Sequence, residues 1–264
     1  MTIETIRTML GAHPWSESLI VVPEIGSTNT ALKELAAQGA PSGTVFIADR
    51  QTGGRGRLGR SFASPAGLGL YFSLLLRPQI DPSLIPHATL RAGLAAAEAI
   101  EVLTGLQPGI KWPNDLVVDT RKLCGILAEA GFSASGRLDW LIIGIGINVG
   151  HAIEDFPPEL QDMATSLAML GHAIPRETLA AELMRQLQGL EADLSAPEHY
   201  LPRYEAQCIT LHQDVQLLQG SSVTPAYALG IAADGGLRVR LADGSERIVG
   251  SGEVSVRGLY GYVK

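Results

Sequence analysis

The feature that most constrains this fold is a glycine- and arginine-rich stretch, "QTGGRGRLGRS" at residues 51–61, which lies between two apolar runs. The run before it, "GTVFIADRQ", and the run after it, "GLGLYFSLLLRP", have the β-branched and aromatic content of buried strands. The glycines of the stretch match the G-x-G-x-x-G pattern of dinucleotide-binding folds. That pattern requires a helix to begin at once, so that helix N–H groups face the pyrophosphate. Pro65, Gly67 and a strand follow here instead, which argues against a Rossmann fold.

Two other readings of the stretch also fit poorly. The segment from Gly54 to Ser61 resembles a phosphate-binding P-loop, but Arg60 stands at the lysine position and no helix follows. An arginine-glycine arm for RNA would normally be longer, repeated and terminal. A solvated loop without a role is the remaining alternative. Ordering so many glycines costs chain entropy, however, and such a cost is usually offset where the backbone approaches a ligand.

Composition sets the broad class. The chain has 264 residues, 46% of them hydrophobic, which is enough for one large core or for a large domain with a small one attached. A net charge of −7 disfavours non-specific binding of nucleic acid, because phosphate contacts require a surplus of Lys and Arg. With only Cys124 and Cys208, no signal-peptide pattern and no long apolar run, we expect a cytoplasmic protein without disulfides or a membrane span.

Periodicity predicts an α+β chain with two domains. Strands are expected over residues 18–28, 43–51, 67–78, 115–130 and 137–149, and helices over residues 1–17, 27–39, 83–103, 157–171 and 175–194. The segment 195–207 is rich in proline and weakly patterned, which suggests a linker or hinge. From residue 213 onward, short runs that alternate between apolar and polar residues are separated by turn signals such as Asp234-Gly235. This pattern is typical of a small SH3-like β-barrel. We therefore predict a mixed sheet with flanking helices over residues 1–212 and a barrel over residues 213–264.

A second polar motif, "KWPND" at residues 111–115, follows a short predicted strand. Pro113 fixes the turn, and Asn114 and Asp115 place an amide and a carboxylate beside Lys111, a neighbourhood suited to phosphate and metal. "STN" at residues 27–29 adds hydroxyls, an amide and the N–H groups of a helix start. "KLCGILAEA" and "GIGIN" add Lys122 and Asn148.

Together these motifs resemble those of biotin–protein ligases. The matching pieces, in the same order and with approximately the same spacing, are "STN", "QTGGRGRLGR", "KWPNDL", "KLCGIL" and "GIGIN", and the resemblance runs from about residue 20 to the end of the chain. It implies a class II synthetase-like catalytic domain, as in biotin and lipoate ligases. Phe62 departs from the family pattern, where Trp is frequent. Some members carry an N-terminal helix-turn-helix domain; we expect that domain to be absent here and expect no binding to DNA.

The resemblance implies a two-step reaction. ATP and Mg²⁺ activate biotin to biotinyl-5′-adenylate, and biotin then passes to a lysine of a biotin carboxyl carrier domain, such as that of acetyl-CoA carboxylase. The implied biotin-binding residues are Ser27, Thr28, Asn29, Gln51, Gly54, Arg55, Gly56, Arg57 and Lys111. The implied nucleotide-binding residues are Arg57, Arg60, Lys111, Asn114, Lys122 and Asn148. Lys111, Arg57 and Asp115 are the implied catalytic residues, with Asp115 either orienting Lys111 or binding Mg²⁺.

The sequence is compatible with alternatives. A lipoate–protein ligase has a related fold and the same acyl-adenylate chemistry, although the glycine-arginine motif favours biotin. A ligand-sensing module that binds nucleic acid is the alternative from another class, and the acidic composition argues against it. Both a monomer and a homodimer are compatible with the sequence. We expect the stretch 51–61 to be a mobile lid over the ligand, because an acyl-adenylate must be shielded from water.

Overall fold

A seven-stranded mixed sheet forms the centre of the molecule, with strand order β1-β2-β3-β7-β6-β5-β4. The computed structural model describes residues 1–251 and 255–258. Within the sheet, β1 is parallel to β2 and every other neighbouring pair is antiparallel. The strands are β1 (Leu19–Ile25), β2 (Thr44–Gln51), β3 (Gly69–Leu76), β4 (Gly109–Lys111), β5 (Asp115–Val118), β6 (Arg121–Phe132) and β7 (Leu138–Asn148).

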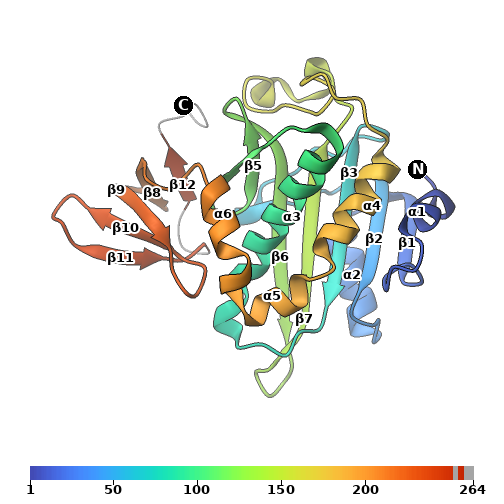
Figure 1. The fold of residues 1–264 in the computed structure, drawn as a ribbon, viewed down its shortest axis with the longest axis horizontal. Coiled ribbons are helices and arrows are strands. Elements are labelled where there is room, and N and C mark those ends of the chain that lie inside the picture. Colours follow the sequence, from blue (N-terminus) through green and yellow to red (C-terminus); the bar gives the residue numbers. More distant parts are fainter. Residues whose placement is uncertain (252–254, 259–264) are drawn as a thin grey trace.

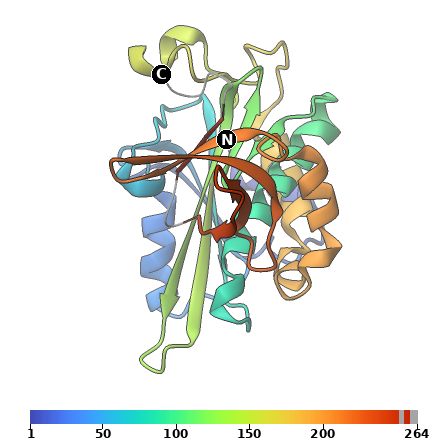
Figure 2. The ribbon, with the colours of Figure 1, turned by 90° about the vertical axis from the view of Figure 1, so that its left-hand side faces the viewer.

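Helices cover both faces of this sheet (Figures 1 and 2). One face packs against α3 (Pro86–Thr104), α4 (Arg176–Leu187) and α6 (Leu201–Gln207), and α5 (Leu190–Ser195) packs on α3. The α2 helix (Thr28–Ala37) lies on the other face. The α3 helix approaches the sheet closely because alanines such as Ala92, Ala95, Ala96 and Ala99 fill its buried face. It ends at Gly105, whose φ of 74° provides the left-handed turn of a helix C-terminus. The short α1 helix (Ile3–Leu10) packs beside α4.

A second, smaller sheet follows α6 (Figure 1). Its strands are β8 (Asp214–Gln219), β9 (Ser222–Ile231), β10 (Leu237–Leu241), β11 (Glu246–Val249) and β12 (Ser255–Gly258), in the order β11-β10-β9-β8-β12. All of its pairings are antiparallel. The predicted fold class, a mixed sheet with flanking helices followed by a small β module, is confirmed. In the described part of the chain, no helix has the length and apolarity that crossing a bilayer requires.

The prediction of a helix over residues 157–171 is wrong. The segment contains the 3-10 turn η4 (Pro158–Leu160), is preceded by the turn η3 (Ile153–Asp155), and is otherwise irregular. Its backbone is paired elsewhere: the Lys122 N–H donates to the carbonyl of Met163 at 2.7 Å, and the Thr165 N–H donates to the carbonyl of Lys122 at 2.9 Å. These bonds to the start of β6 replace the bonds that a helix would make internally.

The prediction of a linker over residues 195–207 is also wrong. This segment forms the turn η5 (Pro197–His199) and the helix α6, and its Pro202 lies in the first turn, where a missing N–H is tolerated. Tyr200 and Tyr204 are four residues apart, lie on one side of the segment and are 0% exposed. Burial of these two rings outweighs the weak local pattern, so the segment is part of the core.

The irregular segment is anchored by His151. Its side chain is 1% exposed, and its ring stacks on that of Phe156 with centroids 4.8 Å apart. Neither ring nitrogen hydrogen-bonds to any residue that the structure describes. Burial lowers the pKa of His151 to about 4, although the charge of Asp155 acts in the opposite direction.

This histidine should make folding sensitive to acid. An unfolded histidine has a pKa of about 6.5, so between roughly pH 6.5 and pH 4 the unfolded chain binds a proton that the folded chain excludes. Its contribution to the unfolding free energy should therefore fall as pH decreases, by up to about 1.4 kcal/mol per pH unit. His151→Phe retains an aromatic ring against Phe156 and should make that dependence shallower in urea unfolding measured across this range. Identical slopes for the two proteins would contradict the assignment.

Candidate active site

A cavity of about 430 Å³ lies over β6 and β7, beside the start of α2 and under the loop that follows β2. Its floor contains Gly125, Gly144 and Gly146, and Gly125 is paired directly with Gly146. Because these residues have no side chains, the cavity reaches close to the sheet backbone, and the side chains of Asn29, Phe62 and Lys122 lie above the glycines. The predicted site residues that line it are Ser27, Thr28, Asn29, Gln51, Arg55, Gly56, Arg57, Arg60, Lys111, Asn114, Asp115, Lys122 and Asn148.

Gly54 is the predicted site residue that is not in that lining. A Cβ atom on Gly54 would lie 2.3 Å from the carbonyl oxygen of Phe62. The Phe62 N–H donates to the Gly54 carbonyl at 2.9 Å, so two parts of the loop pack backbone against backbone. In this structure Gly54 therefore shapes the loop internally.

One end of the cavity is polar and largely neutral. Ser73, 0% exposed on β3, places its hydroxyl 2.7 Å from the Thr28 hydroxyl and 2.6 Å from the Asn29 side-chain oxygen. The Thr28 hydroxyl lies 3.1 Å from the side-chain oxygen of Gln51 and donates to it. Hydroxyls and amides therefore meet here in a connected hydrogen-bond network.

The other end is rich in cations. The Lys122 ammonium and the Asp115 carboxylate form an ion pair at 2.6 Å, and Lys111 is paired with Asp115 in the β4–β5 register. Arg57 donates to the side-chain oxygen of Asn114 at 2.9 Å and to the backbone carbonyl of Ser251 in the C-terminal module. Burial lowers the pKa of the Arg57 guanidinium, while the nearby Asp115 carboxylate raises it. This arrangement gathers positive charge where an anionic group would bind.

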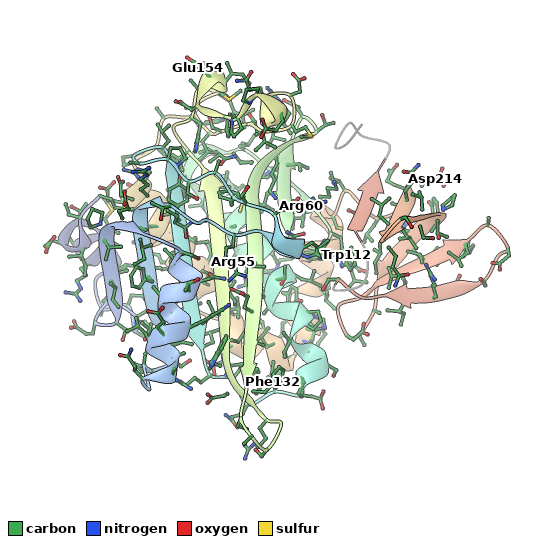
Figure 3. The ribbon with its side chains drawn as sticks, turned by 180° about the vertical axis from the view of Figure 1, so that it is seen from behind. Arg55, Arg60, Trp112, Phe132, Glu154 and Asp214 are labelled. Atoms are coloured by element: carbon green, nitrogen blue, oxygen red, sulfur yellow. The ribbon has the colours of Figure 1, made fainter. Side chains whose placement is uncertain are left out.

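Strand register gives the separation of the two ends. Ser73 is paired with Gly144, which places the neutral end over that part of β7. At the other end, the Asn148 side-chain nitrogen lies 3.4 Å from the Lys122 carbonyl and donates to it. The four residue steps from Gly144 to Asn148 span about 13 Å at roughly 3.3 Å per residue. The cavity thus suits an elongated ligand with an uncharged polar head and an anionic far end. Figure 3 shows Arg55 over the middle of the sheet, with Arg60 and Trp112 nearer to the C-terminal strands.

The donor set does not build a resident metal site. Asp115 is the only carboxylate among the described residues that line the cavity, and it is already paired with Lys122. Within residues 1–251 and 255–258, no group of three or more His, Cys, Asp or Glu side chains is arranged to hold a metal ion. Mg²⁺ commonly binds through one or two carboxylates together with substrate phosphates and water. Mg²⁺ at this site would therefore be held mainly by the phosphates of a nucleoside triphosphate and by water, with Asp115 as the carboxylate that the described lining offers.

Sequence reasoning missed several residues of the site. Ser73 carried a signal, because it is a lone polar residue inside the apolar run "YFSLLL". Glu129 carried another, because it alternates with Gly125 and Leu127 along β6 and so shares their face. Ser73 and Glu129 lie behind the cavity, whereas Phe156, Leu160 and Met163 line it. Leu160 and Met163 fall in the stretch predicted to be helical and Phe156 directly precedes it, so the sequence gave no signal for these three.

Comparison with known proteins agrees with this geometry. Residues 21–148 match the Biotin/lipoate A/B protein ligase family, and residues 211–257 match the Biotin protein ligase C terminal domain. A biotin–[acetyl-CoA-carboxylase] ligase of Mycobacterium tuberculosis is 34% identical over 254 residues, which cover 93% of this chain and 91% of that protein. The chain belongs to the biotin protein ligase family.

Other members of the biotin protein ligase family differ from this chain in length. The bifunctional ligase/repressor BirA of Bacillus spizizenii is 44% identical over 163 residues, 62% of this chain, and the chain spans only about half (50%) of the length of that relative. Among solved structures, a biotin protein ligase from Aquifex aeolicus in complex with biotin and ATP has a TM-score of 0.76 at 33% identity, covering 91% of this chain and 98% of that one. A biotin protein ligase from Leishmania major in complex with biotinyl-5-AMP has a TM-score of 0.60 at 26% identity, covering 88% of this chain and 98% of that one.

The glycine floor of this family member can be tested by comparing two neighbouring positions. A Cβ on Gly144 would lie 2.3 Å from the side-chain oxygen of Asn29, which hydrogen bonds hold in place. A Cβ on Gly146 would lie 2.7 Å from the far edge of the Phe62 ring, whose side chain is only partly buried. Gly144→Ala should lower the unfolding free energy by about 1–3 kcal/mol, and Gly146→Ala by clearly less.

Chemical denaturation of the purified variants measures both costs. Gly93→Ala in α3 is the control, because a Cβ there meets nothing nearer than 3.8 Å. Replacing glycine by alanine inside a helix should stabilise this control by roughly 0.5–1 kcal/mol. Equal losses for Gly144→Ala and Gly146→Ala would show that Asn29 is not held as rigidly as its contacts indicate.

Proposed function

We propose that this protein activates biotin with MgATP to form biotinyl-5′-AMP and then transfers biotin to a lysine of a biotin carboxyl carrier domain. The observation that carries this proposal is one cavity with hydroxyl and amide groups at one end and lysine and arginine groups about 13 Å away along β7. Biotin has a matching polarity, with an uncharged cyclic urea at one end and a carboxylate at the other. The ligands named for the Aquifex and Leishmania relatives support the same reading.

Recognition of biotin would take place at the neutral end. Ser27, Asn29 and Gln51 line the cavity and provide hydrogen-bond donors and acceptors without charge, which suits an uncharged head group. The glycine floor brings the cavity close to the strand backbone, and the fused rings would lie beside the Phe62 ring, which packs over Gly146. Binding at this end would direct the acyl chain and its carboxylate toward the cationic end.

Adenylation would then occur among the cations. A carboxylate oxygen of biotin attacks the α-phosphorus of ATP, an O–P bond forms, and pyrophosphate leaves with the electrons of the broken bond. We propose that Lys111 and Arg57 stabilise the negative charge that accumulates where these two anions meet. Lys122, held by Asp115 at 2.6 Å, and Arg60, Asn114 and Asn148 would position the nucleotide.

In the transfer step, the acceptor lysine attacks as a free amine. A C–N bond forms, AMP leaves with the electrons of the acyl–oxygen bond, and the amine loses a proton. No side chain of the enzyme needs to become covalently attached in either step. Binding would therefore serve to bring together reactants that rarely meet in the correct orientation in solution.

We also propose that residues 1–212 act as the catalytic unit and residues 213–264 help to close the nucleotide side or to dock the carrier domain. The contact of Arg57 with the carbonyl of Ser251 supports this division of roles, because it links the glycine-arginine loop to the C-terminal module. A cytoplasmic location is part of the proposal, and the two cysteines, both buried and free, are compatible with reducing surroundings.

Biotin-dependent release of pyrophosphate tests the proposed activity most directly. The protein is mixed with MgATP and either biotin, lipoate or no acid, and pyrophosphate is measured at saturating nucleotide. We expect release with biotin only. Release with lipoate at an equal or greater rate would make the protein a lipoate ligase, and no acid-dependent release with either would refute an acyl-adenylate activity.

Lys111→Ala should slow adenylation while biotin still binds. Loss of one electrostatic donor typically costs about 3–4 kcal/mol of barrier, which corresponds to a rate loss of roughly several hundredfold. Single-turnover pyrophosphate release measures this step, and calorimetric titration measures biotin affinity. Arg50→Ala, which alters an ion pair of about half-exposed side chains (52% and 51%), is the control and should be unaffected. A folded Lys111→Ala protein that adenylates normally would exclude the proposed role.

Limited proteolysis should report closure of the loop 51–61. Arg55 and Arg60 are exposed, whereas Arg57 is partly buried by its contacts with Asn114 and Ser251. Trypsin should therefore cut the free protein first after Arg55 or Arg60. Biotin with MgATP should slow this cleavage, if the loop closes over the adenylate to exclude water. Cleavage at equal rates with and without ligands would indicate a loop without a covering role.

A further inference from the structure

Behind the neutral end of the cavity, a carboxylate contacts the amide of Asn29. Glu129 lies on β6, with one oxygen 2.9 Å from the Asn29 side-chain nitrogen and the other 2.5 Å from the ammonium of Lys33. Its side chain is 20% exposed, and Glu129 is not among the described residues that line the cavity. Burial alone would raise the pKa of Glu129, but hydrogen bonds from Lys33 and Asn29 and the charges of Lys33 and Arg55 bring it below the ordinary value.

An ionised carboxylate determines which way the Asn29 amide points. A carboxamide has a donor side and an acceptor side, and a carboxylate only accepts hydrogen bonds. Asn29 must therefore turn its nitrogen toward Glu129, and the same nitrogen also donates to the Leu127 carbonyl at 3.4 Å. Its oxygen then lies on the opposite side, 2.6 Å from the Ser73 hydroxyl. Both N–H groups of Asn29 have protein partners, so Asn29 offers the cavity an acceptor.

The side-chain amide of Gln51 is held in the opposite orientation, with its oxygen engaged by the protein. Its oxygen accepts from the Thr28 backbone N–H at 2.9 Å and from the Thr28 hydroxyl at 3.1 Å. Its nitrogen donates to the Ser64 hydroxyl at 3.1 Å, which uses one of two N–H groups. Gln51 therefore offers the cavity a donor. An acceptor and a donor arranged in this way complement a cyclic urea, in which N–H groups flank a carbonyl.

We propose that Glu129 is a positioning residue for biotin recognition: without touching the ligand, it holds the oxygen of Asn29 toward the cavity and so selects a ligand with an N–H group there. This inference rests on the proposed function, because it assumes that biotin occupies the cavity. The ion pair with Lys33 fixes the orientation of the side chain at position 129. Lys33 only donates, so it keeps the group at position 129 with an acceptor toward itself.

Replacing the carboxylate by an amide gives a test that separates orientation from packing. In Glu129→Gln, Lys33 should attract the new side-chain oxygen and leave the new NH₂ group facing Asn29. Asn29 must then turn its oxygen toward position 129 and present its nitrogen to the cavity. We expect the affinity for biotin to fall roughly tenfold to a hundredfold, the usual effect of leaving buried polar groups mismatched.

Two further variants distinguish this from loss of an ion pair. Lys33→Met breaks the same ion pair but keeps the carboxylate, so biotin should bind nearly as it does to the wild type. In the double variant Glu129→Gln/Lys33→Met, the new amide is free to turn its oxygen toward Asn29, and much of the lost affinity should return. Glu24→Gln, in an exposed pair with Arg50 at 2.9 Å, is the matched control and should bind normally.

Affinity is measured by calorimetric titration of each intact, folded variant with biotin in the absence of ATP. If the wild type itself does not bind biotin, the proposed function fails, and that result is distinguishable from failure of this inference. If the wild type binds but Glu129→Gln binds equally well, or if Lys33→Met loses as much affinity as Glu129→Gln, the positioning role is overturned. Should Glu129→Gln fail to fold, the comparison is made between the double variant and Lys33→Met, and weaker binding by the double variant by more than tenfold would overturn it.

Discussion

The pairing of β6 with β7 through glycines is the constraint on which the site depends. Gly125 faces Gly146 across the ladder, and Gly144 lies under Asn29. Backbone hydrogen bonds keep this part of the sheet intact, while the absence of side chains lets Asn29, Phe62 and Lys122 reach over the strands and brings the cavity close to their backbone. The opposite face is closed by the small, buried residues of α3, so the sheet remains covered on one side where it is hollowed on the other. A packed core and a ligand cavity can therefore share the same strands.

The cavity is rich in positive charge although the chain as a whole is acidic. The net charge is −7, yet one cavity is lined by five cationic side chains, those of Arg55, Arg57, Arg60, Lys111 and Lys122. Asp115 is the one carboxylate among the lining residues that the structure describes. Such local concentration strengthens the field inside a partly enclosed site and attracts anions. It would favour ATP and a biotin carboxylate at the same end. Because Asp115 is paired with Lys122, it also limits the repulsion among these cations when no anion is present.

Contacts that join distant parts of the chain hold the site together. Arg57 contacts Asn114 on the β4–β5 turn and Ser251 in the C-terminal module. The irregular segment near Met163 pairs with Lys122 and adds a wall to the cavity. Each of these contacts uses a backbone carbonyl, a backbone N–H or a short amide. The geometry of the loops is therefore set by hydrogen-bond partners that lie far away in sequence.

The sequence by itself determined the class of fold, the positions of most strands and helices, and the polar motifs that resemble those of biotin–protein ligases. It could do so because periodicity, turn residues and local motifs are encoded over a few consecutive residues. It led to error where local pattern and packing disagree, as at Tyr200 and Tyr204, whose burial makes a helix of a segment that reads as a linker. Only the tertiary structure placed Glu129 behind Asn29, Ser73 between Thr28 and Asn29, and Arg57 against Ser251. These contacts join residues far apart along the chain, and the distance and orientation of two side chains depend on how the intervening strands pair and twist, which no local pattern specifies.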